Sequence, residues 1–141
     1  MVRFFDTSAV VPLVISEPHS EAAGKLWAES TTRFAWQWLR VEAEAALVRR
    51  KVPPVGWSHW RKIEDAIHWI EPERNWLQQL RSFNRGVGLR AADAGHLYVM
   101  ERSLHSVPEL QLVTFDREMR AAAENRGIAC LPERMVESRS R

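Results

Sequence analysis

The sequence contains only one cysteine, Cys130, among 141 residues, and it has no Cys/His pattern at zinc-ligand spacing. A disulfide within the chain is therefore excluded, and a reducing compartment is favoured. Long hydrophobic runs are absent as well, because the apolar patch at residues 10–15 is far shorter than the roughly 20 residues that span a bilayer. Asp6 interrupts the start of the chain where a signal peptide would be continuously apolar. These absences predict a cytoplasmic protein that is neither secreted nor inserted in a membrane.

The sequence also lacks the short motifs of several large enzyme classes. GxGxxG, GxxxxGKS/T, GxSxG and HExxH do not occur, so dinucleotide-binding, P-loop, esterase and zincin functions are without their usual signatures. Neither sign of charge is in large excess, since 20 Lys and Arg residues oppose 18 Asp and Glu residues. The resulting net charge of +2 permits a polyanionic partner without demonstrating one.

The order of apolar segments predicts an α/β domain with a central parallel sheet. Short apolar runs alternate with longer segments of helical periodicity, which is typical of βαβ units. We expect about five strands flanked by helices in one domain at residues 1–132, followed by a polar tail at residues 133–141. The expected strands are residues 2–5, 32–36, 68–70, 111–115 and 128–131. The expected helices are residues 7–15, 20–30, 38–51, 57–67, 72–83, 90–104 and 117–125, with breaks at residues 53–56 and 86–88.

A stripe rich in tryptophan lies on one face of the helix expected at residues 57–67. Core packing explains such a stripe, and docking of another protein explains it as well, because aromatic side chains are enriched at interface anchors. The stripe consists of Trp57, Trp60, Ile63, Ile67 and Ile70. Nearby basic residues form either a solvated face or a phosphate-binding rim. They are Arg49, Arg50, Lys51, Arg61 and Lys62.

The most informative residues are carboxylates at positions where apolar side chains belong. Asp93 falls in the middle of a stripe formed by Leu89, Leu97, Met100 and Leu104. A lone carboxylate buried there would cost several kcal/mol, so it needs a cation, a metal or dedicated hydrogen bonds. The alternative is that Asp93 lies in the first helical turn and complements the helix dipole.

Glu42 lies inside the apolar arc of the helix expected at residues 38–51. Trp38, Val41 and Ala45 flank it on one side, and Leu39 and Ala46 flank it on the other. We therefore expect Glu42 to point inward, although a structural ion pair involving Arg49 or a neighbouring helix is an alternative. Glu44 shares the side of Arg40 and Lys51 and is predicted to be a solvated acid.

Asp6 and Asp116 each follow an expected strand of the parallel sheet. Each is a candidate helix N-cap. Together they also lie at the carboxyl ends of two strands, the edge where open α/β sheets bind ligands. With Glu42 and Asp93 they make four acids that could converge, and such a group requires divalent cations such as Mg²⁺ or Mn²⁺ to offset its repulsion. His96, three residues after Asp93, is more typical of a packed helix residue than of a metal ligand.

Four short segments, in order, resemble the PIN-domain ribonucleases and among them the VapC-type toxins of toxin–antitoxin pairs. The first is Phe4-Phe5-Asp6-Thr7-Ser8-Ala9, and the second is Arg40-Val41-Glu42 with Ala45-Ala46-Leu47. The third is Leu89-Arg90-Ala91-Ala92-Asp93-Ala94 with His96-Leu97. The fourth is Leu112-Val113-Thr114-Phe115-Asp116. Together they are spread in order over nearly the whole length of the chain.

The resemblance implies a metal-dependent endoribonuclease that acts as the toxin of such a pair. Asp6, Glu42, Asp93 and Asp116 would be the catalytic quartet that holds Mg²⁺ or Mn²⁺, with Asp6 and Asp93 as central ligands. Hydroxyls would order the site, and they belong to Thr7, Ser8 and Thr114. The implied partners are an RNA substrate, an antitoxin protein and a second copy in a homodimer, with the basic rim contacting RNA or antitoxin. Gly95 departs from the family pattern, where a larger apolar residue is usual.

Two other functions could use the same residues, and the second lacks one of the acids it needs. In a non-catalytic protein- or RNA-binding module, the acids would cap helices and pair with arginines while the tryptophan stripe docks a partner. In a receiver-type phosphotransfer domain, a second acid would be expected beside Asp6, and Thr7 stands there instead.

Overall fold

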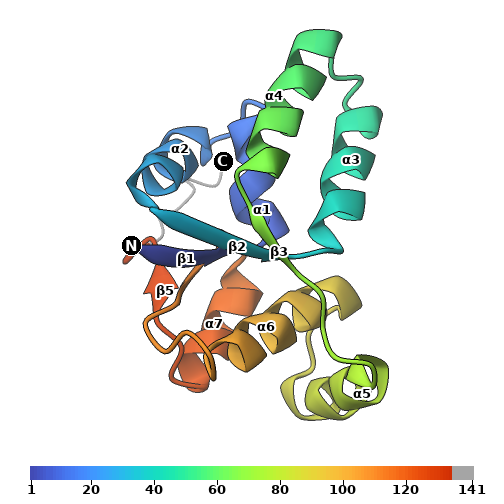
Figure 1. The fold of residues 1–141 in the computed structure, drawn as a ribbon, viewed down its shortest axis with the longest axis vertical. Helices are drawn as coiled ribbons and strands as arrows, with labels where there is room; N and C mark the ends of the chain where they lie inside the picture. The colour runs from blue at the N-terminus through green and yellow to red at the C-terminus, as the bar shows by residue number, and fades with distance from the viewer. Residues whose placement is uncertain (135–141) are drawn as a thin grey trace, which may run out of the picture.

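The chain folds around a single sheet of five parallel strands (Figure 1). The computed structural model describes residues 1–134, so residues 135–141 of the expected polar tail lie outside the described part. The strands are β1 (Val2–Phe5), β2 (Thr32–Trp36), β3 (His68–Ile70), β4 (Gln111–Val113) and β5 (Cys130–Leu131). Their order across the sheet is β3-β2-β1-β4-β5, which puts β1 at the centre. The predicted α/β class and parallel sheet are confirmed.

Helices cover both faces of this sheet (Figure 1). On one face lie α1 (Thr7–Val10), the 3-10 turn η1 (Val11–Leu13), α2 (Ser20–Glu29), α3 (Leu39–Arg49) and α4 (Pro54–Asp65). On the other lie α5 (Trp76–Val87), α6 (Ala91–Ser103) and α7 (Arg117–Asn125). No helix in the described part of the chain is both long and apolar enough to cross a membrane.

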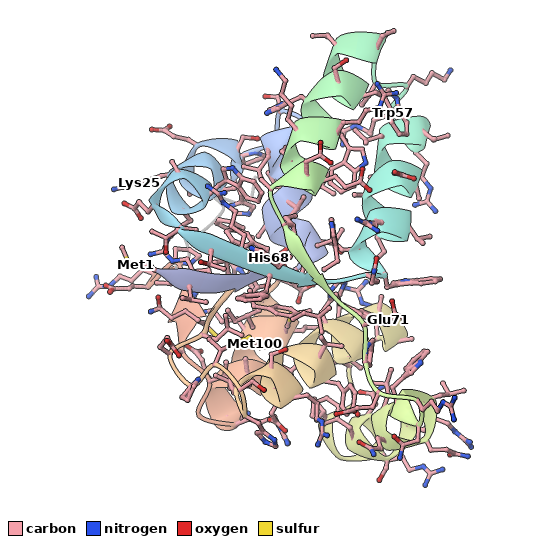
Figure 2. The ribbon with its side chains drawn as sticks, in the orientation of Figure 1. Met1, Lys25, Trp57, His68, Glu71 and Met100 are labelled. Carbon is pink, nitrogen blue, oxygen red and sulfur yellow. The ribbon has the colours of Figure 1, made fainter. Side chains whose placement is uncertain are left out.

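Two apolar cores form because successive residues of a strand face opposite sides of the sheet. Phe5 and Val113 pack into the core beneath α1 to α4. Phe4 and Leu112, their immediate neighbours in the sequence, pack into the core formed with α6 and α7. All four side chains are fully buried. Figure 2 shows Met100 of α6 in this second core.

Three helix boundaries differ from the expected ones at a proline or a glycine. The helix expected at residues 7–15 stops at Val10 and continues as η1, because Pro12 has no N–H for an α-helical hydrogen bond. Pro54 was expected in a break, yet it is the first residue of α4, where a missing N–H costs nothing. Helix α5 starts at Trp76 and runs to Gly88, whose φ of +76° closes it in the left-handed conformation.

Four of the five residues of the tryptophan stripe pack into the first core, as its interpretation as core predicts, whereas Ile70 lies in β3 and packs against the second core. Trp60 is only 1% exposed, and Ile63 and Ile67 are buried beside it. The Trp60 indole Nε1 donates a hydrogen bond to Glu44 Oε2 at 3.0 Å. Glu44 is therefore a half-buried acceptor and not the solvated acid expected from its place on the helix.

Helix α3 buries a different face from the one its apolar arc predicts, because the helix is apolar on two sides. Trp38 and Val41 were expected inside, but they are 47% and 52% exposed. Glu42 lies at the border of the buried face and is half-buried. The face in the core consists of Leu39, Ala43 and Leu47.

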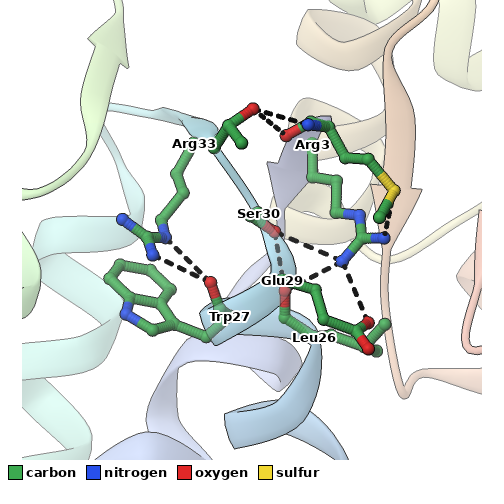
Figure 3. Close-up of polar contacts among 8 residues, drawn as sticks. Arg3, Leu26, Trp27, Glu29, Ser30 and Arg33 are labelled. Carbon is green, nitrogen blue, oxygen red and sulfur yellow. Dashed lines mark hydrogen bonds and ion pairs between the residues drawn. The ribbon is translucent and has the colours of Figure 1, made fainter.

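Two arginines from neighbouring strands hold the C-terminal end of α2 (Figure 3). Arg3 of β1 is paired in register with Arg33 of β2. Arg3 Nη1 donates to the Leu26 carbonyl at 2.9 Å, and Arg33 Nη2 donates to the Trp27 carbonyl at 2.8 Å. These bonds add donors to carbonyls of the last helical turn, which also accept from Ser30, and place positive charge at the negative end of the helix dipole.

Trp36, at the end of β2, packs directly on Gly95 of α6. A Cβ atom on Gly95 would lie 2.3 Å from the Trp36 ring, closer than any real contact allows. The same ring meets His96 edge-to-face, with centroids 5.2 Å apart. Gly95 therefore makes room for the large side chain of Trp36.

We expect Gly95→Ala to lower the free energy of unfolding by about 1–3 kcal/mol, because the added methyl overpacks the contact with Trp36. Urea denaturation measures the change. Gly24→Ala in α2 is the matched control: open space surrounds Gly24, so alanine should raise stability by about 0.5–1 kcal/mol. Shortening Trp36 to Leu in the Gly95→Ala background should recover part of the loss. Equal effects at the two glycines would contradict this account.

Candidate active site

Asp6 and Asp116 lie at the topological switch point of the sheet. From β1 the chain first runs outward to β2 and β3, and it later returns to β4 on the other side of β1. Asp6 directly follows β1, and Asp116 comes three residues after the end of β4, the neighbouring strand. Ligands of open α/β sheets bind at such points, so the predicted placement of these two acids is confirmed.

The Asp6 carboxylate is buried, with 2% of the residue exposed, and its oxygens accept hydrogen bonds from the chain itself. Oδ1 accepts from the Ser8 hydroxyl at 2.7 Å and from the Ala9 N–H at 3.2 Å. Oδ2 accepts from the Thr114 hydroxyl at 2.6 Å. Asp6 is therefore the N-cap of α1 as well as a site residue.

The hydroxyls around Asp6 are themselves fixed by backbone groups of the segment after β4. Ser8 Oγ accepts from the Phe115 N–H at 2.8 Å, and Thr114 Oγ1 accepts from the Asp116 N–H at 3.1 Å. Each hydroxyl thus accepts from the backbone and donates its proton to Asp6. The expected ordering role of Ser8 and Thr114 has this geometric basis.

Burial raises the pKa of Asp6 from 3.8 to about 6. The positive charge of His96 and the hydrogen bonds from Thr114 and Ser8 lower this pKa, while the negative charge of Asp116 raises it. The loss of hydration outweighs the three favourable contacts. Asp6 therefore carries negative charge that its surroundings compensate only in part.

Glu42, Thr7 and His96 form a second group beside Asp6. The Thr7 hydroxyl donates to Glu42 Oε1 at 2.7 Å, and His96 Nε2 lies 2.6 Å from the same oxygen and 3.1 Å from Thr7 Oγ1. Burial raises the pKa of Glu42, but the hydrogen bond and charge of His96 and the Thr7 hydrogen bond outweigh burial and lower it overall. Glu42 thus points toward the site, as predicted.

His96 is a site residue whose contacts the sequence analysis missed. It is 1% exposed, so its interpretation as a packed helix residue is correct but incomplete. Its Nδ1 is buried without a hydrogen-bond partner, whereas Nε2 faces Glu42. Its position three residues after Asp93 was the available signal, because residues at that spacing lie on one helix face.

Arg90 joins the two remaining acids. Its Nε lies 3.6 Å from Asp93 Oδ2, and its Nη2 lies 3.7 Å from Asp116 Oδ2. Burial and the repulsion from Asp116 raise the pKa of Asp93, although Arg90 and His96 act against them. Asp93 also lies in the first turn of α6, and Asp116 accepts from the Met119 N–H at 2.9 Å as the N-cap of α7. The helix-terminus interpretations of both acids are thus correct, and they are compatible with a shared site.

The chemistry of these donors fits a hard divalent cation. The quartet supplies carboxylate oxygens, the ligands that Mg²⁺ and Mn²⁺ prefer. Asp93 and Asp116 already share one cationic group, Arg90. Within residues 1–134, however, no three His, Cys, Asp or Glu side chains are arranged as a ready-made metal site. The hydroxyls and His96 hold Asp6 and Glu42, so a bound cation would have to draw the acids together.

The basic residues of the predicted rim lie away from the Glu42 group. Glu42 is in the first turn of α3 and Arg49 is its last residue, a separation of roughly 10 Å along the helix axis. No ion pair joins these two residues, so the structural pair considered for them is not formed. Contact of the rim with RNA or with an antitoxin stays a prediction. All five rim residues are exposed: Arg49, Arg50, Lys51, Arg61 and Lys62.

Comparisons with known proteins place the fold and go no further. No protein-family model matches the chain, and no curated protein matches it. Among solved structures, the chain is similar to PAE2754 from Pyrobaculum aerophilum, with a TM-score of 0.63 and 24% sequence identity. The match covers 86% of this chain and 84% of that one. At this identity the likeness shows a shared fold.

The pKa of Asp6 predicts how stability changes with pH in the absence of metal. Because the folded pKa of about 6 lies above the ordinary 3.8, the folded protein keeps a proton on Asp6 that the unfolded chain has already lost. The resulting stabilisation is complete below the unfolded value and is lost as pH rises through the folded one. Asn at position 6 does not titrate, so the Asp6→Asn variant has no such pH-dependent loss. Its free energy of unfolding should therefore rise by about 3 kcal/mol relative to that of wild type between about pH 4 and pH 7.

Urea denaturation in the presence of a chelator measures this difference. Asp65→Asn, at the exposed end of α4, is the matched control and should follow the wild-type curve. A difference between Asp6→Asn and wild type that does not change with pH would contradict the assigned burial of the Asp6 charge.

Proposed function

We propose that this protein is a metal-dependent endoribonuclease of the PIN type and acts in the cytoplasm as the toxin of a toxin–antitoxin pair. One observation supports the proposal: four acids from four separate segments lie near enough for their charges to interact. Thr7 and His96 contact Glu42, Thr114 donates to Asp6, and Arg90 pairs with Asp93 and Asp116. The four-segment resemblance to PIN-domain toxins supplies the reaction class and the choice of RNA.

Each acid has a distinct place in the proposed chemistry. Asp6 and Asp93 would be the central ligands of Mg²⁺ or Mn²⁺, and Glu42 and Asp116 would be outer ligands or would orient water. When bound, the cation activates water for attack and offsets charge on the phosphodiester. Ser8 and Thr114 keep the Asp6 oxygens in place, because each of these hydroxyls also accepts a hydrogen bond from a backbone N–H.

The proposed partners are the RNA, an antitoxin that covers the acidic site, and a second copy of the chain. Trp60, Ile63 and Ile67 of the tryptophan stripe are buried, and Trp57 and Ile70 are half-buried, so the stripe offers little surface for a contact between copies. Other large apolar side chains are exposed on α3, at its N-cap and at the start of α4, and we assign the homodimer contact to them. They are Trp38, Val41, Val48 and Val55.

A non-catalytic PIN-like module that binds protein or RNA is the second candidate. It is favoured by the N-cap bonds of Asp6 and Asp116, which give both acids a structural use. The two functions differ in whether divalent cations bind the acids and support hydrolysis.

The purified protein, free of antitoxin, should cleave single-stranded RNA with Mg²⁺ or Mn²⁺ and should stop when a chelator is added. Asp93→Asn should lower the rate at least about 100-fold, because an amide is a poor ligand for a hard cation. Its thermal stability with chelator shows whether the fold is kept. Full activity of Asp93→Asn, compared with wild type from one preparation, would favour the non-catalytic module.

A comparison of Glu42 with Glu44 tests the site within one helix. Glu42→Gln should lower kcat about 100-fold, since this carboxylate faces His96 and Thr7 at the site. Glu44→Gln should leave kcat within about twofold, because its side-chain oxygen can still accept the Trp60 hydrogen bond. Equal losses in the two variants would show that α3 contributes to activity through its stability and not through Glu42.

A further inference from the structure

Arg90 combines two features that are unusual together: its side chain is 78% exposed, yet it pairs with two acids of the candidate site. The distances of 3.6 and 3.7 Å are those of ion pairs without direct hydrogen bonds. Exposed pairs of this kind are weak and easily exchanged for other partners. The guanidinium is thus held near the acids by charge and is free to move.

The backbone next to Arg90 is, by contrast, held by two side-chain hydrogen bonds. Asn84, near the end of α5, donates from Nδ2 to the Leu89 carbonyl and accepts through Oδ1 from the Leu89 N–H, both at 2.8 Å. Gly88 precedes this residue in the left-handed conformation. Arg90 itself is the N-cap residue of α6, with no side-chain cap bond to break. The backbone therefore fixes where the Arg90 side chain starts, while its exposed guanidinium can exchange one anionic partner for another.

The charges around the Arg90 guanidinium determine what it can bind. Burial and the repulsion from Asp116 raise the pKa of Asp93, and without metal the positive charge of Arg90 acts against both. A divalent cation bound by the same carboxylates would repel the guanidinium and remove its need for them. An RNA phosphate brought to that cation would carry the negative charge nearest to Arg90, and guanidinium groups bind phosphate oxygens well.

We propose that Arg90 is a substrate-positioning residue that pairs with Asp93 and Asp116 in the metal-free protein and binds an RNA phosphate once a cation occupies those acids. The inference rests on the proposed nuclease function. It deepens that function by naming the side chain that receives the phosphate.

The first test measures Mn²⁺ affinity without RNA, from the free-ion signal in electron paramagnetic resonance. Arg90→Ala should bind Mn²⁺ several-fold more tightly than wild type, because no guanidinium competes for the acids. Arg90→Lys should stay near wild type, because it keeps the charge. Arg85→Ala, an exposed arginine on α5, is the control for net charge and should also stay near wild type. Weaker Mn²⁺ binding by Arg90→Ala would overturn the proposal, because Arg90 would then organise the acids for the metal.

The second test measures single-stranded RNA cleavage at saturating Mn²⁺ over a range of salt concentrations. Arg90→Ala should raise KM about ten- to a hundredfold with a smaller change in kcat, the loss expected for one charged hydrogen-bonding contact. Its plot of log KM against log salt should be shallower than wild type by about 0.7, the value for one phosphate contact on a single strand. Arg90→Lys should restore the salt slope and only part of the KM, because an ammonium cannot bind phosphate in two places.

The outcomes separate this inference from the proposed function. A wild-type protein that cleaves no RNA with either metal overturns the nuclease proposal. A wild-type protein that cleaves RNA, with KM and salt slope unchanged in Arg90→Ala, overturns only the assignment of Arg90. Should Arg90→Ala fail to fold, Arg90→Lys tests the assignment instead. A wild-type salt slope with a raised KM would support it, and wild-type values of both quantities would overturn it.

Discussion

The burial of the Asp6 carboxylate at the end of the central strand imposes most of the order seen at the candidate site. A charge in that position needs hydrogen-bond donors, and the chain provides them from α1 and from the segment after β4. The hydroxyls of Ser8 and Thr114 are held in turn, because the backbone N–H groups of Phe115 and Asp116 donate to their oxygens. The two strands on either side of the switch point are therefore joined by polar contacts as well as by sheet pairing.

Charge balance explains why the other residues of the site are where they are. The four acids are accompanied by two groups that can carry positive charge, one buried and one exposed. His96 takes the buried position and meets Glu42, which is half-buried. Arg90 takes the exposed position and pairs with Asp93 and Asp116. Asp6, the most deeply buried of the four acids, has no cationic side chain within ion-pair distance among the described residues, and burial raises its pKa to about 6.

The strands and the acids at their ends could be predicted because a parallel sheet gathers its carboxyl ends at one edge. Asp6 and Asp116 needed only the apolar runs before them. The inward direction of Glu42 was also predictable, but the apolar arc around it was wrong, since α3 is apolar toward solvent as well as toward the core. His96 could not be assigned in this way, because its partner Glu42 lies 54 residues away in the sequence. Helices α3 and α6 cover opposite faces of the sheet (Figure 1), and only the folded chain brings these two side chains together.

The double hydrogen bond between Asn84 and Leu89 makes the site depend on the most peripheral helix. Helix α5 has no fully buried residue and lies apart from the sheet in Figure 1. Half-buried apolar side chains pack it against the second core: Trp76, Leu80, Phe83 and Val87. A helix packed in this way opens more readily than one with fully buried side chains. Opening of the last turn of α5 releases Leu89, and with it the backbone that positions Arg90. Anything that clamps or loosens this outer helix is thereby coupled allosterically to the acids at the centre of the sheet.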